Sequence, residues 1–461
     1  MRRLLVLEIN EIPLRVFRWH AQNAPNSATA RLLARAQVGQ SNADEPLPRE
    51  LYPSQSWASQ AMGVPFSDHG VFWYGDPKPA RFPLYWQAAA HSGRSVGFMG
   101  TLHSSPLKSQ LPSGDVRFAV PDPFAPDADT IPGRLSPFQR VNLDMTQANS
   151  RVVADTSPIL SYFKLAGALT RTGISPRTVV EAGRLALSVA RRQVPKERLR
   201  SGQFHLMADQ FLRLAKKYDP DLSILFTNHI ASAMHRYWYA SFPEDWDEPL
   251  YDDDWIRRFE GELPYAMRAL DYWLEPLMRW VDATDRTMLI LSSMGQIGGS
   301  PVENAENDAL IVRDQAAFAR AIGVQQPFTV GKAMVPQITY QFDSDATAAE
   351  VAAMIGGPNS ALQVDRSERA VTVGYSTIRP ESQKVELGGS WHTLEEAGLE
   401  FVEVSEQRIA VHHPLGSLIA YNSPTAKIGD EPVDYLTVAP AILRSLGVEP
   451  LAHHQTPGFI L

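Results

Sequence analysis

The chain has 461 residues, of which 44% are apolar and 20% charged, ordinary values for a globular protein that buries a sizeable core. It carries 43 Lys and Arg against 51 Asp and Glu, and this net charge of −8 argues against a generally basic nucleic-acid-binding protein. The absence of cysteine excludes disulfides, thiolate nucleophiles, zinc fingers and iron–sulfur clusters.

The amino-terminal segment begins like a signal peptide for only a few residues. Two arginines precede the apolar run Leu4–Leu7, but Glu8, Asn10 and Glu11 interrupt this run before it reaches the roughly 7–15 residues of a secretory segment. No later stretch approaches about 18 uninterrupted apolar residues, so we expect no membrane span. From these features we expect a cytoplasmic protein.

Three short apolar runs, rich in branched residues, end in polar clusters. The runs are Leu4–Ile9, Leu222–Phe226 and Met288–Leu291, and they are followed by Asn10 and Glu11, by Thr227 to His229, and by Ser292 to Gly295. This pattern is typical of buried parallel strands. The three runs predict a doubly wound α/β fold, with a mostly parallel sheet, helices on both faces and a ligand site at the carboxyl ends of the strands.

The rest of the chain predicts helices and two insertions. Apolar residues at spacings of three and four predict an amphipathic helix over Glu260–Val281 that covers the sheet. We expect the core in three parts (1–120, 219–300 and 401–461), separated by a helical insertion that forms a lid or cap (121–218) and by a smaller mixed α+β insertion (301–400).

The helical insertion is locally basic. Residues 171–200 carry eight Lys or Arg against two Glu, in a chain that is acidic overall. This charge indicates either a solvated helix face or a lid that attracts an anionic substrate or a membrane surface.

Three segments carry a resemblance to a known family. They are Tyr52–Ser59 with the following Gly63-Val64-Pro65 and Asp68–Val71, then Thr227–Trp238, and finally Val433–Leu443 with Leu446-Gly447-Val448. In this order they resemble the alkaline phosphatase superfamily, especially its type I phosphodiesterase/nucleotide pyrophosphatase branch. The resemblance implies an alkaline-phosphatase-like α/β core and leaves both insertions unmatched. It also implies chemistry on a phosphoryl or sulfuryl group at two metal ions held by Asp and His ligands.

When the family pattern is carried over residue by residue, most of the implied metal ligands are replaced. The first Asp falls on Asn10, the Asp of an Asp-x-x-x-His motif on Ala231, and the Asp and His of a Ser-Asp-His-Gly motif on Ser293 and Met294. Two imidazoles are retained, His235 and, four residues before Gly416, His412. The nucleophile falls on Ser56, with Ser54 as the alternative.

His235 and His412 are therefore the remaining candidate metal ligands. Two imidazoles without a carboxylate make an incomplete zinc site and a poor site for a hard cation. Glu11 would add a carboxylate, but the alternation of side chains along a strand predicts that it points away from its neighbour Asn10. We expect either no cofactor or a single divalent ion, zinc or manganese, bound by His235 and His412.

The same residues predict a polar pocket. We expect Ser56, Glu11, His235 and His412 to be catalytic, with Ser56 as nucleophile beside an imidazole base and Glu11 as a general base if burial raises its pKa. The expected substrate-binding residues are Asn10, Trp57, Arg236, Trp238, Ser293 and Gln296. Trp57 and Trp238 either stack on a sugar or nucleobase or pack in the core.

The sequence favours a divergent enzyme on the alkaline phosphatase fold. It would be a hydrolase or transferase for a phosphoryl-, sulfuryl- or glycosyl-containing substrate, with a reduced or absent metal site. The alternative is a non-catalytic descendant that binds an anionic or sugar-containing ligand or a protein partner. Polar replacements at Asn10 and Ser293 favour a working pocket, whereas Ala231 and Met294 favour the alternative. The expected partner is a small anionic or sugar-containing substrate, and no nucleic acid is expected.

Overall fold

The structure is a computed structural model of the chain. It describes residues 3–47, 50–72, 74, 76, 78–111, 114–148, 173–195, 198–299, 308–331, 338–355, 362–367, 369–375, 384–403 and 409–461. Parts of both predicted insertions, including 149–172 and 301–307, lie outside these residues. Within the described ranges, no helix is both long and apolar enough to cross a membrane.

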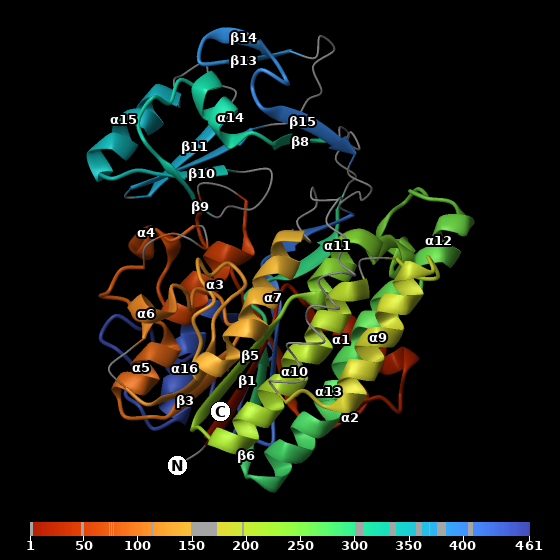
Figure 1. The fold of residues 1–461 in the computed structure, drawn as a ribbon. Helices are drawn as coiled ribbons and strands as arrows, with labels where there is room; N and C mark the ends of the chain where they lie inside the picture. Colours follow the sequence, from red (N-terminus) through yellow and green to blue (C-terminus); the bar gives the residue numbers. More distant parts are fainter. Residues whose placement is uncertain are drawn as a thin grey trace.

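An eight-stranded sheet with the order β18-β2-β17-β6-β1-β5-β3-β4 forms the centre of the molecule (Figure 1). Every strand runs in the same direction except β17, which is antiparallel to both of its neighbours. The strands are β1 (Arg3–Ile9), β2 (Gln37–Asn42), β3 (Val96–Met99), β4 (Val116–Val120), β5 (Leu222–Thr227), β6 (Arg286–Leu291), β17 (Leu415–Tyr421) and β18 (Val433–Asp434). The three strands predicted from the sequence are β1, β5 and β6, which pair at the centre of the sheet. The predicted α/β fold with a mostly parallel sheet is confirmed.

Strand β1 explains why both faces of this sheet carry helices. Its side chains alternate between two buried clusters, with Leu5, Leu7 and Ile9 in one and Leu4 and Val6 in the other. Because both sets are apolar, each face of the sheet must be covered.

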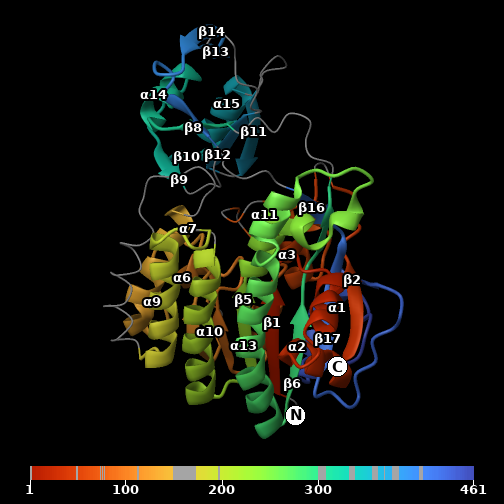
Figure 2. The same ribbon diagram turned by 90° about the vertical axis from the view of Figure 1, so that its right-hand side faces the viewer.

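The first face is covered by the larger set of helices. These are α1 (Leu14–Asn23), α2 (Ala28–Arg35), α7 (Ser136–Ala148), α9 (Pro176–Ala190), α10 (Leu199–Tyr218), α11 (His229–Ser241) and α13 (Glu262–Ala283), with α12 (Asp253–Phe259) beside α11. Helices α9, α10 and α13 form a row in front of the sheet in Figure 2. The predicted helix over Glu260–Val281 corresponds to α13.

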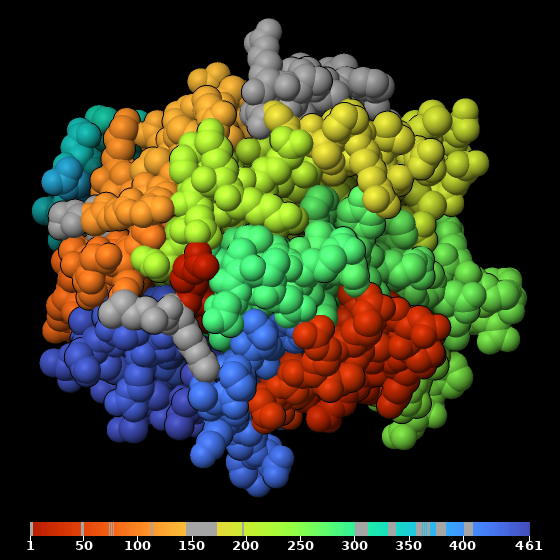
Figure 3. All heavy atoms as spheres, turned by 90° about the horizontal axis from the view of Figure 1, so that it is seen from below, coloured from red at the N-terminus to blue at the C-terminus, as the bar shows by residue number. Residues whose placement is uncertain are grey.

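The second face is covered by α3 (Pro53–Met62), α5 (Tyr85–His91), α6 (Leu107–Gln110) and α16 (Val438–Ser445), and the short α4 (Phe66–His69) follows α3. Seen from the amino ends of the parallel strands, segments from the two ends of the chain lie side by side (Figure 3). The pairing of β2 with β17 agrees with this view.

Helix α10 belongs to the core although the sequence places it in the helical insertion. Its residues Phe204, Phe211 and Leu214 are buried in the same cluster as β1. This end of the predicted insertion therefore packs on the sheet face, whereas a lid would lie over the strand ends.

The second insertion forms a smaller α+β unit with its own buried cluster, which includes Phe318, Tyr340, Val351 and Val371. It consists of β8 (Asp308–Val312), α14 (Gln315–Ala321), β9 (Thr329–Gly331), β10 (Ile338–Gln341), α15 (Asp345–Ile355), β11 (Leu362–Ser367), β12 (Ala370–Tyr375), β13 (Lys384–Leu387), β14 (Ser390–Thr393) and β15 (Leu399–Glu403). Four of its strands form a sheet in the order β11-β12-β10-β9. The unit lies on the side of the core where the parallel strands end (Figure 1).

A two-stranded antiparallel ribbon connects this unit to the core. The chain leaves the core through β7 (Gly295–Gly298) and returns through β16 (Ala410–His413), and these two strands pair with each other. Gln296 lies directly opposite His412 in this ribbon.

The packing of β17 predicts the effect of a substitution at Gly416. A Cβ there would lie 2.4 Å from the carbonyl oxygen of Ser292 and 3.0 Å from Ser41 Oγ, and backbone cannot move away cheaply. We expect G416A to lower the free energy of unfolding by about 1–3 kcal/mol.

G183A is the matched control, because a Cβ at Gly183 in α9 meets no atom within 4 Å. We expect this variant to be unchanged or more stable by roughly 0.5–1 kcal/mol. Urea unfolding of the parent chain, G416A and G183A measures both changes in the free energy of unfolding. Equal stability of G416A and the parent chain would contradict the close approach of β17 and Ser292.

Candidate functional site

The polar residues predicted to line a pocket gather where the parallel strands end. Asn10 and Glu11 follow β1, Ser56 and Trp57 lie in α3, His235, Arg236 and Trp238 lie in α11, Ser293 follows β6, and Gln296 and His412 lie in the β7–β16 ribbon. Parallel strands bring such residues together because their carboxyl ends share one edge of the sheet.

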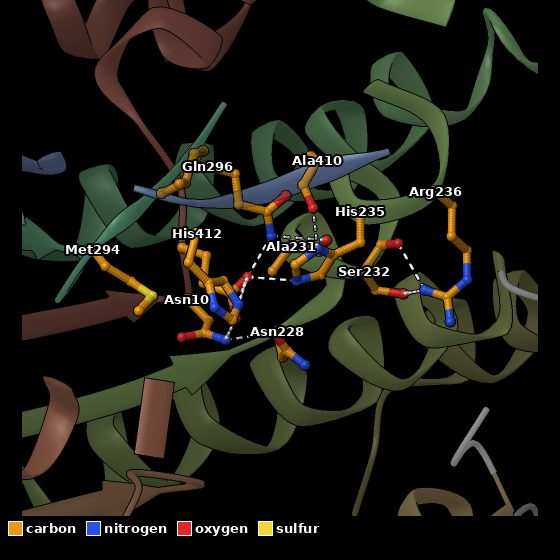
Figure 4. Close-up of polar contacts among 12 residues, drawn as sticks. Asn10, Asn228, Ala231, Ser232, His235, Arg236, Met294, Gln296, Ala410 and His412 are labelled. Atoms are coloured by element: carbon orange, nitrogen blue, oxygen red, sulfur yellow. Dashed lines mark hydrogen bonds and ion pairs between the residues drawn. The ribbon is translucent and has the colours of Figure 1, made fainter. Parts of the chain in front are cut away.

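Glu11 is the centre of this group. Its Oε2 atom lies 2.7 Å from His235 Nε2 and 3.4 Å from His412 Nε2. Gln296 Nε2 donates a hydrogen bond to the same oxygen, and Asn10 Nδ2 donates to Oε1 at 2.8 Å. Figure 4 shows the His235 and His412 rings and the Gln296 amide turned toward one another. The Glu11 side chain is therefore buried among nitrogen donors.

The predicted orientation of Glu11 is wrong. Side chains alternate only along a regular strand, and β1 ends at Ile9. Glu11 has a φ of 56°, in the left-handed region, so the chain turns sharply after the strand. This turn brings the Glu11 carboxylate within hydrogen-bond distance of the Asn10 amide, on the same side of the chain.

Both imidazoles present Nε2 to Glu11 because their other nitrogen is held by the backbone. His235 Nδ1 lies 3.1 Å from the carbonyl oxygen of Ala410, and His412 Nδ1 lies 2.7 Å from that of Leu51. A carbonyl oxygen only accepts, so each Nδ1 carries a proton. Two Nε2 lone pairs facing a carboxylate would repel it, so a positive charge is required between them, either protons on Nε2 or a metal ion.

The donor set fits a divalent metal. Burial alone would raise the pKa of the Glu11 carboxyl, but the charges and hydrogen bonds of His235 and His412 outweigh burial and hold that pKa well below its ordinary value. One ligand atom from each of the three residues lies within 4.8 Å of the others. Two histidines and one glutamate are the protein ligands of several catalytic zinc sites, which keep a further position open.

Gln296 adds an acceptor beside this centre. Its Nε2 atom donates to Glu11 and, at 3.4 Å, to the carbonyl oxygen of Ala231. Its Oε1 atom is buried and has no hydrogen-bond partner within the described part of the chain. The amide therefore offers an unused oxygen close to the three candidate ligands.

Ser56 and Ser293 form a hydrogen-bonded pair. Their hydroxyl oxygens lie 2.8 Å apart, and Ser56 Oγ also lies 3.4 Å from the carbonyl oxygen of Pro53. Both side chains are fully buried. The partner of Ser56 is thus a second hydroxyl, whereas the sequence predicted an imidazole base.

Trp57 positions Asn10. Its Nε1 atom donates to Asn10 Oδ1 at 2.7 Å, and its ring packs edge-on against Phe226 at 5.6 Å. Asn10 Nδ2 in turn donates to Glu11 and, at 2.8 Å, to Asn228 Oδ1. The buried Trp57 therefore fixes the amide that fixes the Glu11 carboxylate, and it presents no ring face for stacking.

Arg236 and Trp238 turn away from Glu11. The Arg236 guanidinium donates to the carbonyl and the hydroxyl oxygens of Ser232, each at 2.8 Å, as Figure 4 shows. Trp238 is fully buried and donates to Asp245 Oδ2 at 2.7 Å. Of the two alternatives stated for Trp238, the structure places the ring in the core.

Sequence reasoning missed four further residues near these strand ends, Tyr74, Lys78, His103 and Asp122. His103 and Asp122 follow β3 and β4, and both are fully buried. The strand-end pattern that pointed to Asn10 would have found both, had Val96–Met99 and Val116–Val120 been recognised as strands.

A second buried carboxyl lies in β1 itself. Glu8 accepts hydrogen bonds from Tyr85 Oη at 2.7 Å and from Thr101 Oγ1. Burial raises the pKa of Glu8 to about 7, although both hydrogen bonds act in the opposite direction. Unlike Glu11, Glu8 has no cation beside it among the described residues, and this difference explains why the two pKa values move in opposite directions.

No protein-family model and no curated protein sequence matches the chain. Solved structures with a similar fold include the murine ectonucleotide pyrophosphatase/phosphodiesterase 5, with 9% identity, a TM-score of 0.42, and coverage of 99% of this chain and 97% of that chain. Phosphonoacetate hydrolase from Sinorhizobium meliloti 1021, in complex with phosphonoformate, has 12% identity, a TM-score of 0.43, and coverage of 97% and 96%.

Thermus thermophilus alkaline phosphatase has 13% identity, a TM-score of 0.44, and coverage of 99% of this chain and 93% of that chain. All three belong to the alkaline phosphatase superfamily, which the sequence resembles. The fold class itself rests on the order and direction of the strands described above.

The raised pKa of Glu8 predicts a pH-dependent stability. The folded-state pKa of about 7 lies above the ordinary 4.5. The contribution of Glu8 to the free energy of unfolding is therefore fully present below pH 4.5 and is lost as the pH rises through 7. The E8Q side chain stays neutral at every pH. As the pH rises from 5 to 8, we expect the free energy of unfolding of E8Q to increase relative to that of the parent chain by up to about 3 kcal/mol.

Urea unfolding at pH 5, 6, 7 and 8 measures this difference. E248Q removes a carboxylate at an exposed position and controls for the loss of surface charge. Parallel stability curves for E8Q and the parent chain would mean that Glu8 is ionised in the folded protein at low pH.

Proposed function

We propose that the chain is a hydrolase or transferase for a phosphoryl-containing substrate, and that it works with one divalent metal ion held by Glu11, His235 and His412. The observation that carries this proposal is the convergence of both Nε2 atoms on one Glu11 oxygen, with each Nδ1 proton bound to a backbone carbonyl. Histidines that bind metals are commonly oriented in this way by a hydrogen bond from their other nitrogen.

A bound divalent ion would polarise a phosphoryl oxygen and lower the pKa of a hydroxyl or water. The residues of the chain supply the rest of the site. Glu11 brings a negative charge that favours a cation, Asn10 holds this carboxylate in place, and Ser56 offers a hydroxyl in the first turns of α3. Peptide N–H groups at the start of a helix favour an anion there, which suits a phosphoryl group next to Ser56.

The first test of this proposal is the metal content of the purified chain. We expect about one zinc or manganese ion per chain by mass spectrometry, and we expect E11Q, H235A and H412A each to lose it, because a site with two remaining ligands binds zinc poorly. H91A is the matched control, because His91 is exposed at the end of α5.

A chain that purifies without metal and shows no rise in melting temperature with zinc or manganese would contradict the proposal. The three side chains would then be a protonated hydrogen-bonded cluster. Equal metal content in H235A and H91A would contradict the assignment of the ligands.

The second test concerns Ser56. With bis(p-nitrophenyl) phosphate and p-nitrophenyl phosphate as substrates, we expect S56A to lower kcat by about 100-fold or more with little change in KM, because the attacking hydroxyl is removed. S54A, in the same turn of α3, serves as the control and tests the alternative nucleophile.

A non-catalytic binding protein is the second candidate, favoured by the serine partner and full burial of Ser56. Binding of phosphonates without turnover of either ester would support that candidate. A larger loss of kcat in S54A than in S56A would move the nucleophile to Ser54.

A further inference from the structure

A second polar cluster lies next to the Glu11 centre and consists of Tyr74, Lys78, His103 and Asp122. The start of α3 joins the two groups. The Leu51 carbonyl accepts from His412 Nδ1 at 2.7 Å, and three residues later the Ser54 carbonyl accepts from His103 Nε2 at 2.5 Å. Between them, Tyr52 packs edge-on against the His412 ring at 5.7 Å. One short segment therefore holds a histidine from each group.

His103 brings a buried acceptor to this cluster. Because Nε2 is bonded to a carbonyl oxygen, it carries the proton, and Nδ1 has a lone pair. Nδ1 is buried and has no hydrogen-bond partner among the described residues, which is unfavourable for a polar atom. Burial first, and then the charge of Lys78, lowers the pKa of His103 to about 3, so the ring stays neutral. His103 also has a φ of 62°, a strained conformation of the kind that gathers at functional sites.

Lys78 brings donors to the cluster. Its ammonium donates to the carbonyl oxygens of Asp76 and Ser105, each at the long distance of 3.3 Å, and its third N–H has no partner within the described ranges. Asp122 binds the same Ser105 from its other side, through the backbone N–H at 3.0 Å. Burial lowers the pKa of Lys78, and the charge of Asp122 acts in the opposite direction. Lys78 is partly exposed.

The third member of this cluster is Tyr74. Its ring stacks on Phe124 at 3.9 Å and lies 5.6 Å from the His103 ring. Burial raises the pKa of the Tyr74 hydroxyl, and the charges of Glu11 and Asp122 act in the same direction, so this hydroxyl keeps its proton and remains a donor. Tyr74 is also partly exposed.

We propose that Tyr74, Lys78 and His103 form the subsite for the alcohol part of the substrate, and that they recognise a hydroxyl group, as in a sugar or a polyol. A hydroxyl can donate to His103 Nδ1 while it accepts from Lys78 or Tyr74, whereas an anionic group can only accept. The nearby Asp122 carboxylate also disfavours a second anion. This inference rests on the proposed function, because it assumes that a phosphoryl group binds at the Glu11 centre.

Isothermal titration calorimetry with non-hydrolysable phosphonates tests the inference without relying on activity. The probes are alkyl-, ω-hydroxyalkyl- and ω-carboxyalkylphosphonates with chains of two, three and four carbons, titrated into the zinc-treated chain. At the best chain length, we expect the hydroxyl compound to bind about tenfold more tightly than the alkyl compound.

We expect Lys78→Met and Tyr74→Phe to remove most of this gain in affinity and to leave the affinity for the alkyl compound unchanged. Lys108→Met, at an exposed lysine, is the matched control and should keep the gain.

The comparison of probes on the unmodified chain keeps the inference testable even if a variant fails to fold. Equal affinity for hydroxyl and alkyl compounds at every length would overturn it, and His103 Nδ1 would then be satisfied by a buried water. Tighter binding of the carboxyl compounds would overturn it in favour of a second anionic group. If none of the phosphonates binds, the proposed function itself fails and the inference fails with it. If all three classes bind equally, the phosphoryl site at the Glu11 centre stands and the inference alone is wrong.

Discussion

The candidate site depends on one constraint, which is that the buried Glu11 carboxylate must be balanced by positive charge. Glu11 is 3% exposed, and its carboxylate oxygens face two imidazole nitrogens and two amide groups. A buried carboxyl without such partners holds its proton more strongly, as the raised pKa of Glu8 in the preceding strand β1 illustrates. Three neighbouring elements hold the carboxylate: α11 supplies His235, the ribbon supplies His412 and Gln296, and α3 holds Asn10 through Trp57.

The fold and the edge of the sheet that carries the site could be predicted from the sequence. Apolar runs that end in polar residues are a local signal, and β1, β5 and β6 all produce it. The resemblance to the alkaline phosphatase superfamily, carried over residue by residue, points to the two histidines. The alternation of side chains does not predict the orientation of Glu11, because the strand ends at Ile9 and Glu11 lies in the turn that follows. A left-handed residue after a strand depends on how the following segment packs, and no residue pattern marks it here.

Other parts of the site could not be predicted, for physical reasons. Arg236 follows His235 directly, and only the rotation of α11 decides that His235 faces Glu11 while Arg236 faces Ser232. Tyr74 and Lys78 follow the short α4, outside any regular element, so no periodicity indicates where their side chains lie. Ser56 has a serine as its partner because β6 ends near α3, a contact between residues far apart in the chain.

The β7–β16 ribbon has a consequence for the architecture of the whole chain. In topological terms the second insertion is the connection of a very long hairpin, whose first strand carries Gln296 and whose second strand carries His412. The entropy lost on closing such a loop grows only with the logarithm of its length, by about 0.6 kcal/mol for each doubling. The ladder hydrogen bonds, rather than closeness in sequence, therefore keep these two side chains opposite each other. A core built in this way can carry an insertion of almost any size at this point without changing the geometry around Glu11.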